Sequence, residues 1–339
     1  MKDTKKIILN ILIFALLIFF TYYFIFKDYD MKYVMENIRN LDLCFLVLAF
    51  ATMFLYFVLE ALNIRLILKS FNEKLSIFQA IKNVLICFFF SAITPGGSGG
   101  QPIAIYYLSK EKINVSHSTM AFLIELFGYN CSKVIIGTVS YFLLPDEIRS
   151  ELRVIFIIGF CFSMVPTLLT LIGIFYKKLA AKLVGLTIRI LKFFKVKDME
   201  EKEKVIREEL KLFSDSSHYV KKHKKEFIKS IVLSALQVLT FYIIPFIVYK
   251  SLHLDGISIL MFIACQAVIH CSASSIPIPG AVGITETVFL VIYGFIYASP
   301  DLLQSSLIVS RMVTFYVYVV VSLIVYLITL LKVEKKSWF

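Results

Sequence analysis

Two glycine-rich stretches hold the residues of this sequence that are best suited to bind a ligand through backbone groups. The first, PGGSGGQP, interrupts residues 83–109, which include no charged residue, and the second, PIPGAVGITE, covers residues 277–286. Glycine lets a backbone turn sharply and approach a ligand closely, and a helix that follows such a turn begins with free N–H groups and a positive dipole end. We therefore predict that an anionic group such as a phosphate binds near Gln101 and Ile284. The candidate binding residues are Pro95, Gly96, Gly97, Gly99, Gly100 and Gln101 in the first stretch and Pro277, Pro279, Gly280, Gly283 and Glu286 in the second.

Charged residues inside apolar segments are the next candidates, because a charge at the centre of a bilayer costs at least about 2.5–3.5 kcal/mol on insertion scales. Glu286 follows the second stretch, and Arg311 lies inside the last apolar segment. We predict that these two residues form an ion pair, that Arg311 also meets a lipid phosphate, and that Glu125 faces the same cavity and attracts a cationic headgroup with Glu286. An ion pair that only holds two helices together is an equal alternative for Arg311.

Several other polar residues are weaker candidates. Glu60 lies close in sequence to Arg65, the long side chain of Lys133 could extend to the membrane surface, and His270 is of a type more often satisfied by packing than used as a ligand. The cysteines show no CxxC pairing and lie in apolar segments, as expected of packing residues rather than disulfides or metal ligands; they are Cys44, Cys87, Cys131, Cys161, Cys265 and Cys271. We therefore predict no metal site and no cofactor.

Nucleotide and nucleic-acid chemistry are not indicated. The first glycine-rich stretch lacks the Gly-Lys-Ser/Thr ending of an NTP-binding loop. The basic segment 177–229 contains sixteen Lys or Arg against eight Asp or Glu, but no stacking-aromatic pattern or recognisable nucleic-acid module. Its first part instead alternates apolar and basic faces in a helical pattern, which is typical of a helix that lies on an anionic membrane surface.

The elements that must position these residues are membrane helices, because 59% of the residues are hydrophobic and only 18% are charged. A spanning helix needs about 20 apolar residues. Long apolar segments cover residues 7–26, 43–59, 83–109, 116–144, 154–176, 230–249, 256–285 and 312–331. The first of these lacks a cleavage site of small residues, so we interpret it as an uncleaved helix.

The distribution of basic residues predicts how these segments cross the membrane. Cytoplasmic loops are enriched in Lys and Arg, and segment 177–229 reaches the cytoplasm only if residues 83–109 turn back at the first glycine-rich stretch instead of crossing. By the same argument, residues 256–297 turn back at the second glycine-rich stretch instead of crossing the membrane. Both termini are then cytoplasmic. The sequence therefore predicts an all-α membrane protein with about six full spans and two re-entrant hairpins that enter from opposite faces.

The two halves resemble an inverted repeat. One membrane domain would cover residues 1–339, with a first half at 43–176 that breaks at 94–102, the basic cytoplasmic segment at 177–229, and a second half at 230–331 that breaks at 275–286. Aligning Pro95 with Pro279 superimposes a shared P-G-x-x-G. Opposed broken helices are typical of transporters whose substrate site lies near the bilayer midplane. Proline and glycine kinks in ordinary spanning helices are the alternative.

With these motifs the sequence resembles, from about Ile7 to Leu331, the transmembrane region of the lysylphosphatidylglycerol synthase family, also called the flippase-like or multiple peptide resistance factor family. The family writes the second motif approximately as P-x-P-G-G-x-G-x-x-E, and Ala281 here replaces one glycine. The first motif commonly includes Gly-Glu-Pro, and here Gln101 stands where a glutamate is usual, which speaks against a proton-coupling role at this position.

The resemblance implies a domain that moves an aminoacylated phospholipid such as lysyl-phosphatidylglycerol to the outer leaflet of the cell membrane and confers resistance to cationic peptides. The family's enzymes carry a further cytoplasmic domain that transfers lysine from tRNA, and only KVEKKSWF follows Leu331, so transfer by this chain alone is not expected. A phosphatidylglycerol lysyltransferase and a membrane scaffold for a separate synthase remain the alternatives. The expected partners are membrane phospholipids, with a synthase or further copies of the chain as additional candidates.

Overall fold

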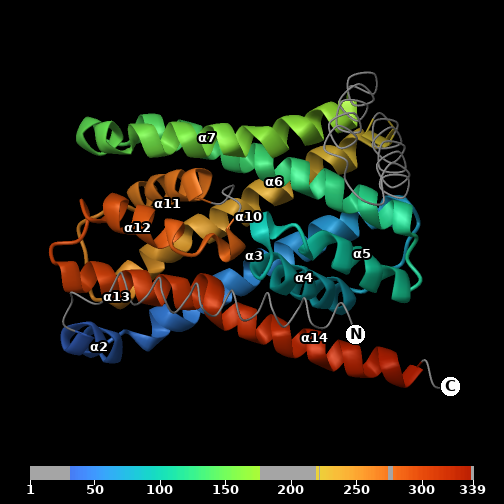
Figure 1. Ribbon diagram of the computed structural model, residues 1–339, viewed down its shortest axis with the longest axis horizontal. Coiled ribbons are helices and arrows are strands. Elements are labelled where there is room, and N and C mark those ends of the chain that lie inside the picture. Colours follow the sequence, from blue (N-terminus) through green and yellow to red (C-terminus); the bar gives the residue numbers. More distant parts are fainter. Residues whose placement is uncertain (1–30, 176–218, 221, 274–277, 337–339) are drawn as a thin grey trace, which may run out of the picture.

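The protein is a bundle of long helices with two pairs of short helices inserted between them (Figure 1). The computed structural model describes residues 31–175, 219–220, 222–273 and 278–336. Along the chain the elements are α2 (Met31–Arg39), α3 (Leu43–Ser70), α4 (Ile77–Ala92), the 3-10 turn η1 (Pro95–Gly97), α5 (Gly100–Lys110), α6 (Val115–Leu143), α7 (Asp146–Phe175), α10 (Lys224–Ser251), α11 (Ile259–Ala273), the 3-10 turn η2 (Pro279–Ala281), α12 (Ile284–Tyr293), α13 (Pro300–Arg311), the π-helical segment η3 (Met312–Tyr316) and α14 (Val317–Lys336).

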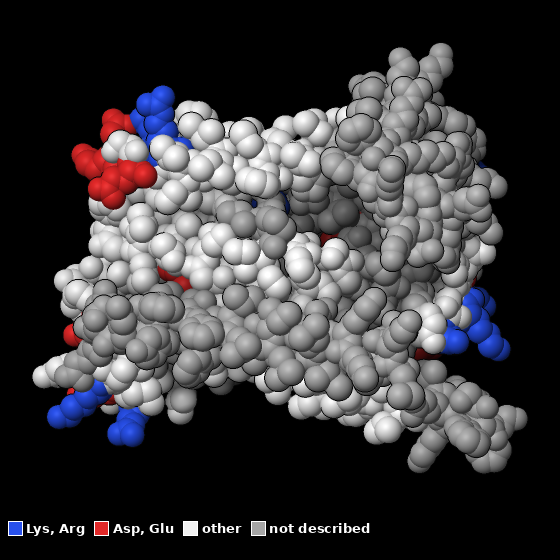
Figure 2. Space-filling view, in the orientation of Figure 1, with Lys and Arg blue, Asp and Glu red and all other residues white. Residues whose placement is uncertain are grey.

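The long helices confirm the predicted all-α polytopic membrane fold. Five helical segments in the described part of the chain are long and apolar enough to cross a bilayer: Leu43–Ser70, Val115–Leu143, Asp146–Ile172, Lys224–Ser251 and Pro300–Leu331. The charged side chains visible in Figure 2 gather mainly at the two ends of the long axis, and the described residues visible between these ends are largely uncharged. The first predicted span, residues 7–26, and most of the basic segment 177–229 lie outside the described residues.

The short helices form two antiparallel hairpins. In the first, the Asn83 side chain of α4 donates a hydrogen bond to the Ala104 carbonyl of α5 at 2.8 Å. In the second, the Tyr293 hydroxyl of α12 donates to the Phe262 carbonyl of α11 at 3.4 Å. The chain therefore turns back at both glycine-rich stretches and does not continue through a kink. The hairpins lie toward opposite ends of the long helices and point toward each other (Figure 1).

A helix cap and polar contacts at its base explain where the first hairpin begins and ends. Ser76 and Gln79 form a reciprocal capping box that begins α4. At the base of the hairpin, Glu111 forms an ion pair with Lys82 and accepts a hydrogen bond from Gln79. These contacts fix both ends of the hairpin on one side of the molecule. The arms have 16 and 11 residues, so even the longer arm extends only about 24 Å, which is less than the ~30 Å hydrocarbon core of a bilayer.

The two turns begin with the same backbone conformation, as the shared P-G-x-x-G motif predicts. Thr94 and Ile278 are extended, and the glycines that follow the prolines are left-handed, with φ 60° and ψ 20° at Gly96 and φ 60° and ψ 9° at Gly280. The turns then diverge, because Gly283 has φ 92° whereas Gly99 is in the right-handed helical region with φ −85°. The symmetry between the halves is therefore local.

Ala281 adopts the left-handed region at φ 49°, which costs a residue with a Cβ about 1–2 kcal/mol. We expect Ala281→Gly to raise the free energy of unfolding by about 1 kcal/mol, after the extra chain entropy of glycine is subtracted. The matched control is Ala264→Gly inside α11, which should lower stability by a similar amount. Thermal unfolding of both variants in one detergent measures this, and a destabilised Ala281→Gly protein would contradict it.

Candidate functional site

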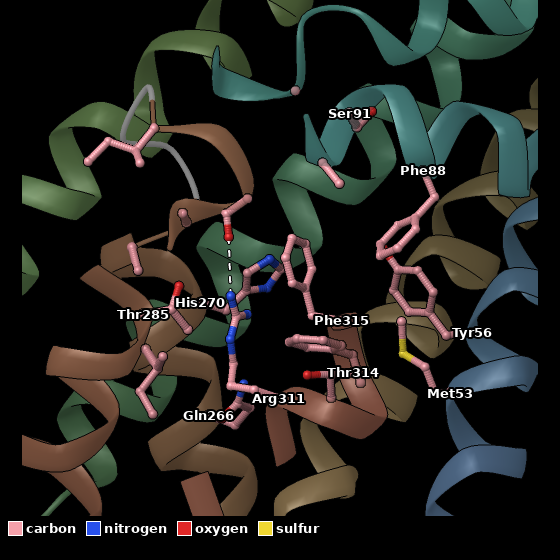
Figure 3. Close-up of a pocket in the computed structure, with 18 of the residues that line it drawn as sticks. Met53, Tyr56, Phe88, Ser91, Gln266, His270, Thr285, Arg311, Thr314 and Phe315 are labelled. Carbon is pink, nitrogen blue, oxygen red and sulfur yellow. Dashed lines mark hydrogen bonds between the residues drawn. The ribbon is translucent and has the colours of Figure 1, made fainter. Parts of the chain in front are cut away.

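The tips of the two hairpins meet at an internal cavity. Turns η1 and η2 contact each other, and a cavity of about 270 Å³ lies beside them. Its lining combines backbone of both turns, through Gly96 and Gly280, with side chains from α3, α4, α6, α10, α11, α12, α13 and η3 (Figure 3). Polar lining residues are Tyr56, Ser91, Tyr129, Gln266, His270, Thr285, Arg311 and Thr314. Sequence positions nearly two hundred residues apart thus share one site.

Arg311 is the cationic residue of this cavity among the described lining residues. Its Nε donates to Glu286 Oε1 at 2.7 Å, and its Nη2 donates to the Gly280 carbonyl at 3.4 Å. The guanidinium also lies over the rings of Phe315 and Tyr316, at 4.5 and 5.5 Å from their centroids, an arrangement that favours a cation electrostatically. The predicted ion pair with Glu286 is therefore present, and it fixes the guanidinium against turn η2.

The π-helical segment η3 explains why the ring of Tyr316, five residues after Arg311, reaches the guanidinium. It begins at Met312, directly after Arg311, and ends at Tyr316. A π-helical turn contains one residue more than an α-helical turn, and such segments are frequent at functional sites. Arg311, Thr314 and Phe315 have the i, i+3, i+4 spacing of one helix face and all line the cavity.

Glu286 has a second role at the beginning of α12. Its Oε2 accepts a hydrogen bond from the Gly283 N–H at 2.7 Å, and its Oε1 also accepts from the Tyr316 hydroxyl at 3.3 Å. The side chain is fully buried. The prediction of a free N–H group and an open dipole end near Ile284 is therefore wrong for Gly283, because the carboxylate of the same helix occupies that place.

The beginning of α5 is arranged differently. The Gly99 N–H is bound by the Thr94 hydroxyl at 2.9 Å, but α5 has no acidic residue in its first turn. The positive end of this helix is thus not compensated by a carboxylate of its own first turn. Gly100 lies against α4 so closely that a Cβ there would be 2.5 Å from the Cys87 carbonyl oxygen.

A second cavity of about 400 Å³ adjoins the first on the other side of η1. Gly96, Gly97, Tyr129 and His270 line both cavities. The second cavity adds Ser98, Gln101, Leu126, Asn130, Lys133 and Pro166. Lys133 is only 3% exposed, so this lysine is buried beside the cavity and does not reach the membrane surface, contrary to the alternative considered from the sequence.

Both ring nitrogens of His270 have partners, in agreement with the prediction of a residue satisfied by packing, and the side chain also lines both cavities. Its Nδ1 and Nε2 lie 3.1 and 3.3 Å from the hydroxyls of Tyr242 and Tyr129, and the Tyr56 hydroxyl donates to Tyr129 at 3.2 Å. This chain of rings connects α3, α6, α10 and α11 beside both cavities. No motif could have revealed it, because the four residues come from four separate helices.

With the geometry established, the sequence comparison identifies the family. Residues 7–322 match the family described as the lysylphosphatidylglycerol synthase TM region. The chain belongs to this family. The match includes both hairpins, both cavities and the Arg311–Glu286 ion pair.

Curated relatives of this lysylphosphatidylglycerol synthase TM-region protein come from archaea. A UPF0104 membrane protein of Methanothermobacter thermautotrophicus is 22% identical over 293 residues, which cover 83% of this chain and 84% of the relative. A UPF0104 membrane protein of Archaeoglobus fulgidus is 26% identical over 101 residues, which cover 30% of this chain and 31% of the relative. Both names describe membrane proteins without an activity.

The remaining predicted residues of this family member fall into four groups. Gly97 lines both cavities, and Gln101 lines the second. Five residues form or flank the turns but line neither cavity: Pro95, Gly99, Gly100, Pro279 and Gly283. Pro277 lies outside the described residues. Glu125 is buried in α6 but is not among the lining residues of either cavity, which it was expected to face.

Proposed function

We propose that this protein carries an anionic or aminoacylated phospholipid, such as lysyl-phosphatidylglycerol, between the leaflets of the plasma membrane. The observation that carries the proposal is the cavity at the meeting point of the two hairpin turns, which is lined by the guanidinium of Arg311. Backbone that forms no regular helix is tolerated at membrane depth only where it is buried in protein or lines a polar cavity. The short arms and opposed directions of the hairpins support a re-entrant arrangement, with both termini cytoplasmic.

The composition of the cavity suits a lipid headgroup. Arg311 offers charge-assisted donors to a phosphate, which a guanidinium binds in its own plane. The N-terminal end of α5, which has no acidic residue in its first turn, adds a favourable potential for an anion. Met53, Phe88 and Phe315 supply apolar lining next to these groups. Export of an aminoacylated lipid by this route would lower the negative charge of the outer surface and so reduce attraction of cationic antimicrobial peptides.

The test is leaflet exchange of fluorescent lysyl-phosphatidylglycerol in liposomes that contain the purified protein. We expect exchange above empty liposomes, slowed about tenfold or more by Thr285→Leu, because a contact change of ~1.4 kcal/mol corresponds to a factor of ten. Thr285 lines the cavity, and its side chain makes no hydrogen bond to the other described residues, so its replacement fills space without breaking the Arg311–Glu286 ion pair. Arg149→Ala, which removes an exposed ion pair with Asp146, is the control and should exchange normally.

Phosphatidylglycerol without the lysyl group is the second probe. Exchange of both lipids would assign recognition to the phosphate, whereas exchange of the lysyl lipid alone would assign it to the headgroup amine. Exchange of neither lipid above the empty-liposome rate would contradict the proposal.

A further inference from the structure

A group of oxygen-bearing side chains, buried except for the half-buried Glu60, lies where α3, α6 and α10 pack together, and none of them lines the lipid cavity. Glu60 on α3 and Glu125 on α6 contribute carboxylates. Neither carboxylate forms an ion pair with another described residue, and the nearby Arg65 is engaged by the Leu75 carbonyl at 2.8 Å. Two carboxylates that lack a cationic partner require a physical explanation, since uncompensated charge is costly inside a bundle.

Helical spacing places the two carboxylates opposite each other. Tyr56 precedes Glu60 by four residues and Tyr129 follows Glu125 by four, so each tyrosine shares a helix face with its glutamate. The two tyrosine hydroxyls are 3.2 Å apart, and α3 and α6 run in opposite directions. The glutamates therefore lie on the same side of the tyrosine pair.

Two amide side chains complete the group. Gln237 on α10 donates through Nε2 to Glu60 Oε2 at 3.1 Å, and Asn63 on α3 donates through Nδ2 to Ser234 Oγ at 2.9 Å. Both amides are at least 99% buried, yet Gln237 Oε1 and Asn63 Oδ1 accept no hydrogen bond. Buried acceptor atoms without a hydrogen-bond partner are uncommon. A donor or a cation bound beside them would satisfy these two oxygens.

Close packing confines this group. A Cβ at Gly128 of α6 would lie 2.7 Å from Ser234 Oγ of α10, so the two helices are nearly in contact one turn from Glu125. The titratable side chains that face the carboxylates are Tyr56 on α3, Cys87 on α4 and Tyr129 on α6, while α10 contributes the neutral Gln237. These neighbours add no positive charge.

We infer that Glu60, Glu125, Asn63, Gln237 and Ser234 form a binding site for one cation, Na⁺ or a proton. All of these side chains offer oxygen atoms, which are the ligands that hard cations prefer. Mg²⁺ gives up its water reluctantly, so a readily dehydrated Na⁺ or a bare proton suits a site enclosed by three helices. Because Tyr56 and Tyr129 also line the lipid cavity, the occupied site is positioned to influence that cavity; this consequence rests on the proposed lipid transport, whereas cation binding does not.

The test is thermal unfolding of the purified protein in NaCl compared with choline chloride at equal ionic strength. A cation that binds only the folded state stabilises it, so we expect saturating Na⁺ to raise the melting temperature by roughly 3–6 °C. The rise should disappear in Glu125→Gln and in Glu60→Gln. Ser132→Ala is the matched control, because it removes a buried α6 hydroxyl that bonds only to the Gly128 carbonyl, and it should keep the full rise.

A pH series distinguishes the two cations. If a proton is the ligand, Na⁺ has no effect, and the melting temperature instead falls as pH rises in the wild type but not in Glu125→Gln. If the wild type and both glutamine variants respond identically to Na⁺ and to pH, the inference is wrong. Lipid exchange is measured separately, so its presence without any cation effect would leave the proposed function intact and reject only this site.

Discussion

Arg311→Ala is expected to lower the free energy of unfolding by about 3–5 kcal/mol, because removal of one partner leaves the other charge of a buried ion pair uncompensated. Glu286 is fully buried and Arg311 is 8% exposed, so water does not replace the lost partner. The same substitution removes the bond from Nη2 to the Gly280 carbonyl and so loosens turn η2. Denaturant or thermal unfolding in detergent measures the loss, with Arg149→Ala expected to fall within about 1 kcal/mol of the wild type.

A double variant separates the structural role of this ion pair from its role in lipid binding. Arg311→Met combined with Glu286→Gln removes both charges, and it should be more stable than Arg311→Ala, since replacement of a whole buried pair is often close to neutral. If lipid exchange is lost in Arg311→Ala and stays lost in the double variant while stability returns, Arg311 contacts the lipid. If exchange returns together with stability, the pair only holds α12 and α13 together, which is the alternative left open by the sequence.

Gly100→Ala is expected to destabilise the protein by about 1–3 kcal/mol, the usual cost of overpacking a close contact. An added Cβ would lie 2.5 Å from the Cys87 carbonyl oxygen and would also clash with the Ser91 hydroxyl. Because Cys87 belongs to the backbone of α4, relief requires the two arms of the first hairpin to separate. Unfolding of this variant beside Gln101→Ala, an adjacent and only half-buried position, measures the effect. Equal stability of the two variants would show that the hairpin tolerates wider spacing.

The sequence was sufficient for the parts of the structure that depend on chain-local signals. The two turns are marked by proline and glycine, and the ion pair between Glu286 and Arg311 follows from the scarcity of charges in apolar segments. Conversely, the positions of Glu125 and His270 could not be predicted. The helices that carry them are apolar around much of their circumference, so hydrophobic periodicity does not distinguish the buried face from the lipid-facing one. Their neighbours are determined by packing between helices distant in sequence.

The capping role of Glu286 was missed for a related reason. The sequence places this glutamate three residues after Gly283, which is the spacing of a capping box. Glu286 was predicted as the ion-pair partner of Arg311, and the N–H groups near Ile284 were predicted to be free. One carboxylate serves both purposes, with one oxygen for each. A buried carboxylate has several acceptor sites to satisfy, so two roles are the ordinary expectation.

The π-helical segment after Arg311 shows that the last span accommodates an additional residue without a break in the helix. A wide turn accommodates one additional residue while the helix on either side keeps its direction and packing. Deletion of a single residue from Met312–Tyr316 would therefore let α13 and α14 join as one regular helix, with both flanks in their present register. Deletion of Phe315 or Tyr316 would also remove one of the two rings that lie over the Arg311 guanidinium. In this span the additional residue brings Tyr316, five positions after Arg311, to the side of the helix on which Arg311 and Phe315 lie.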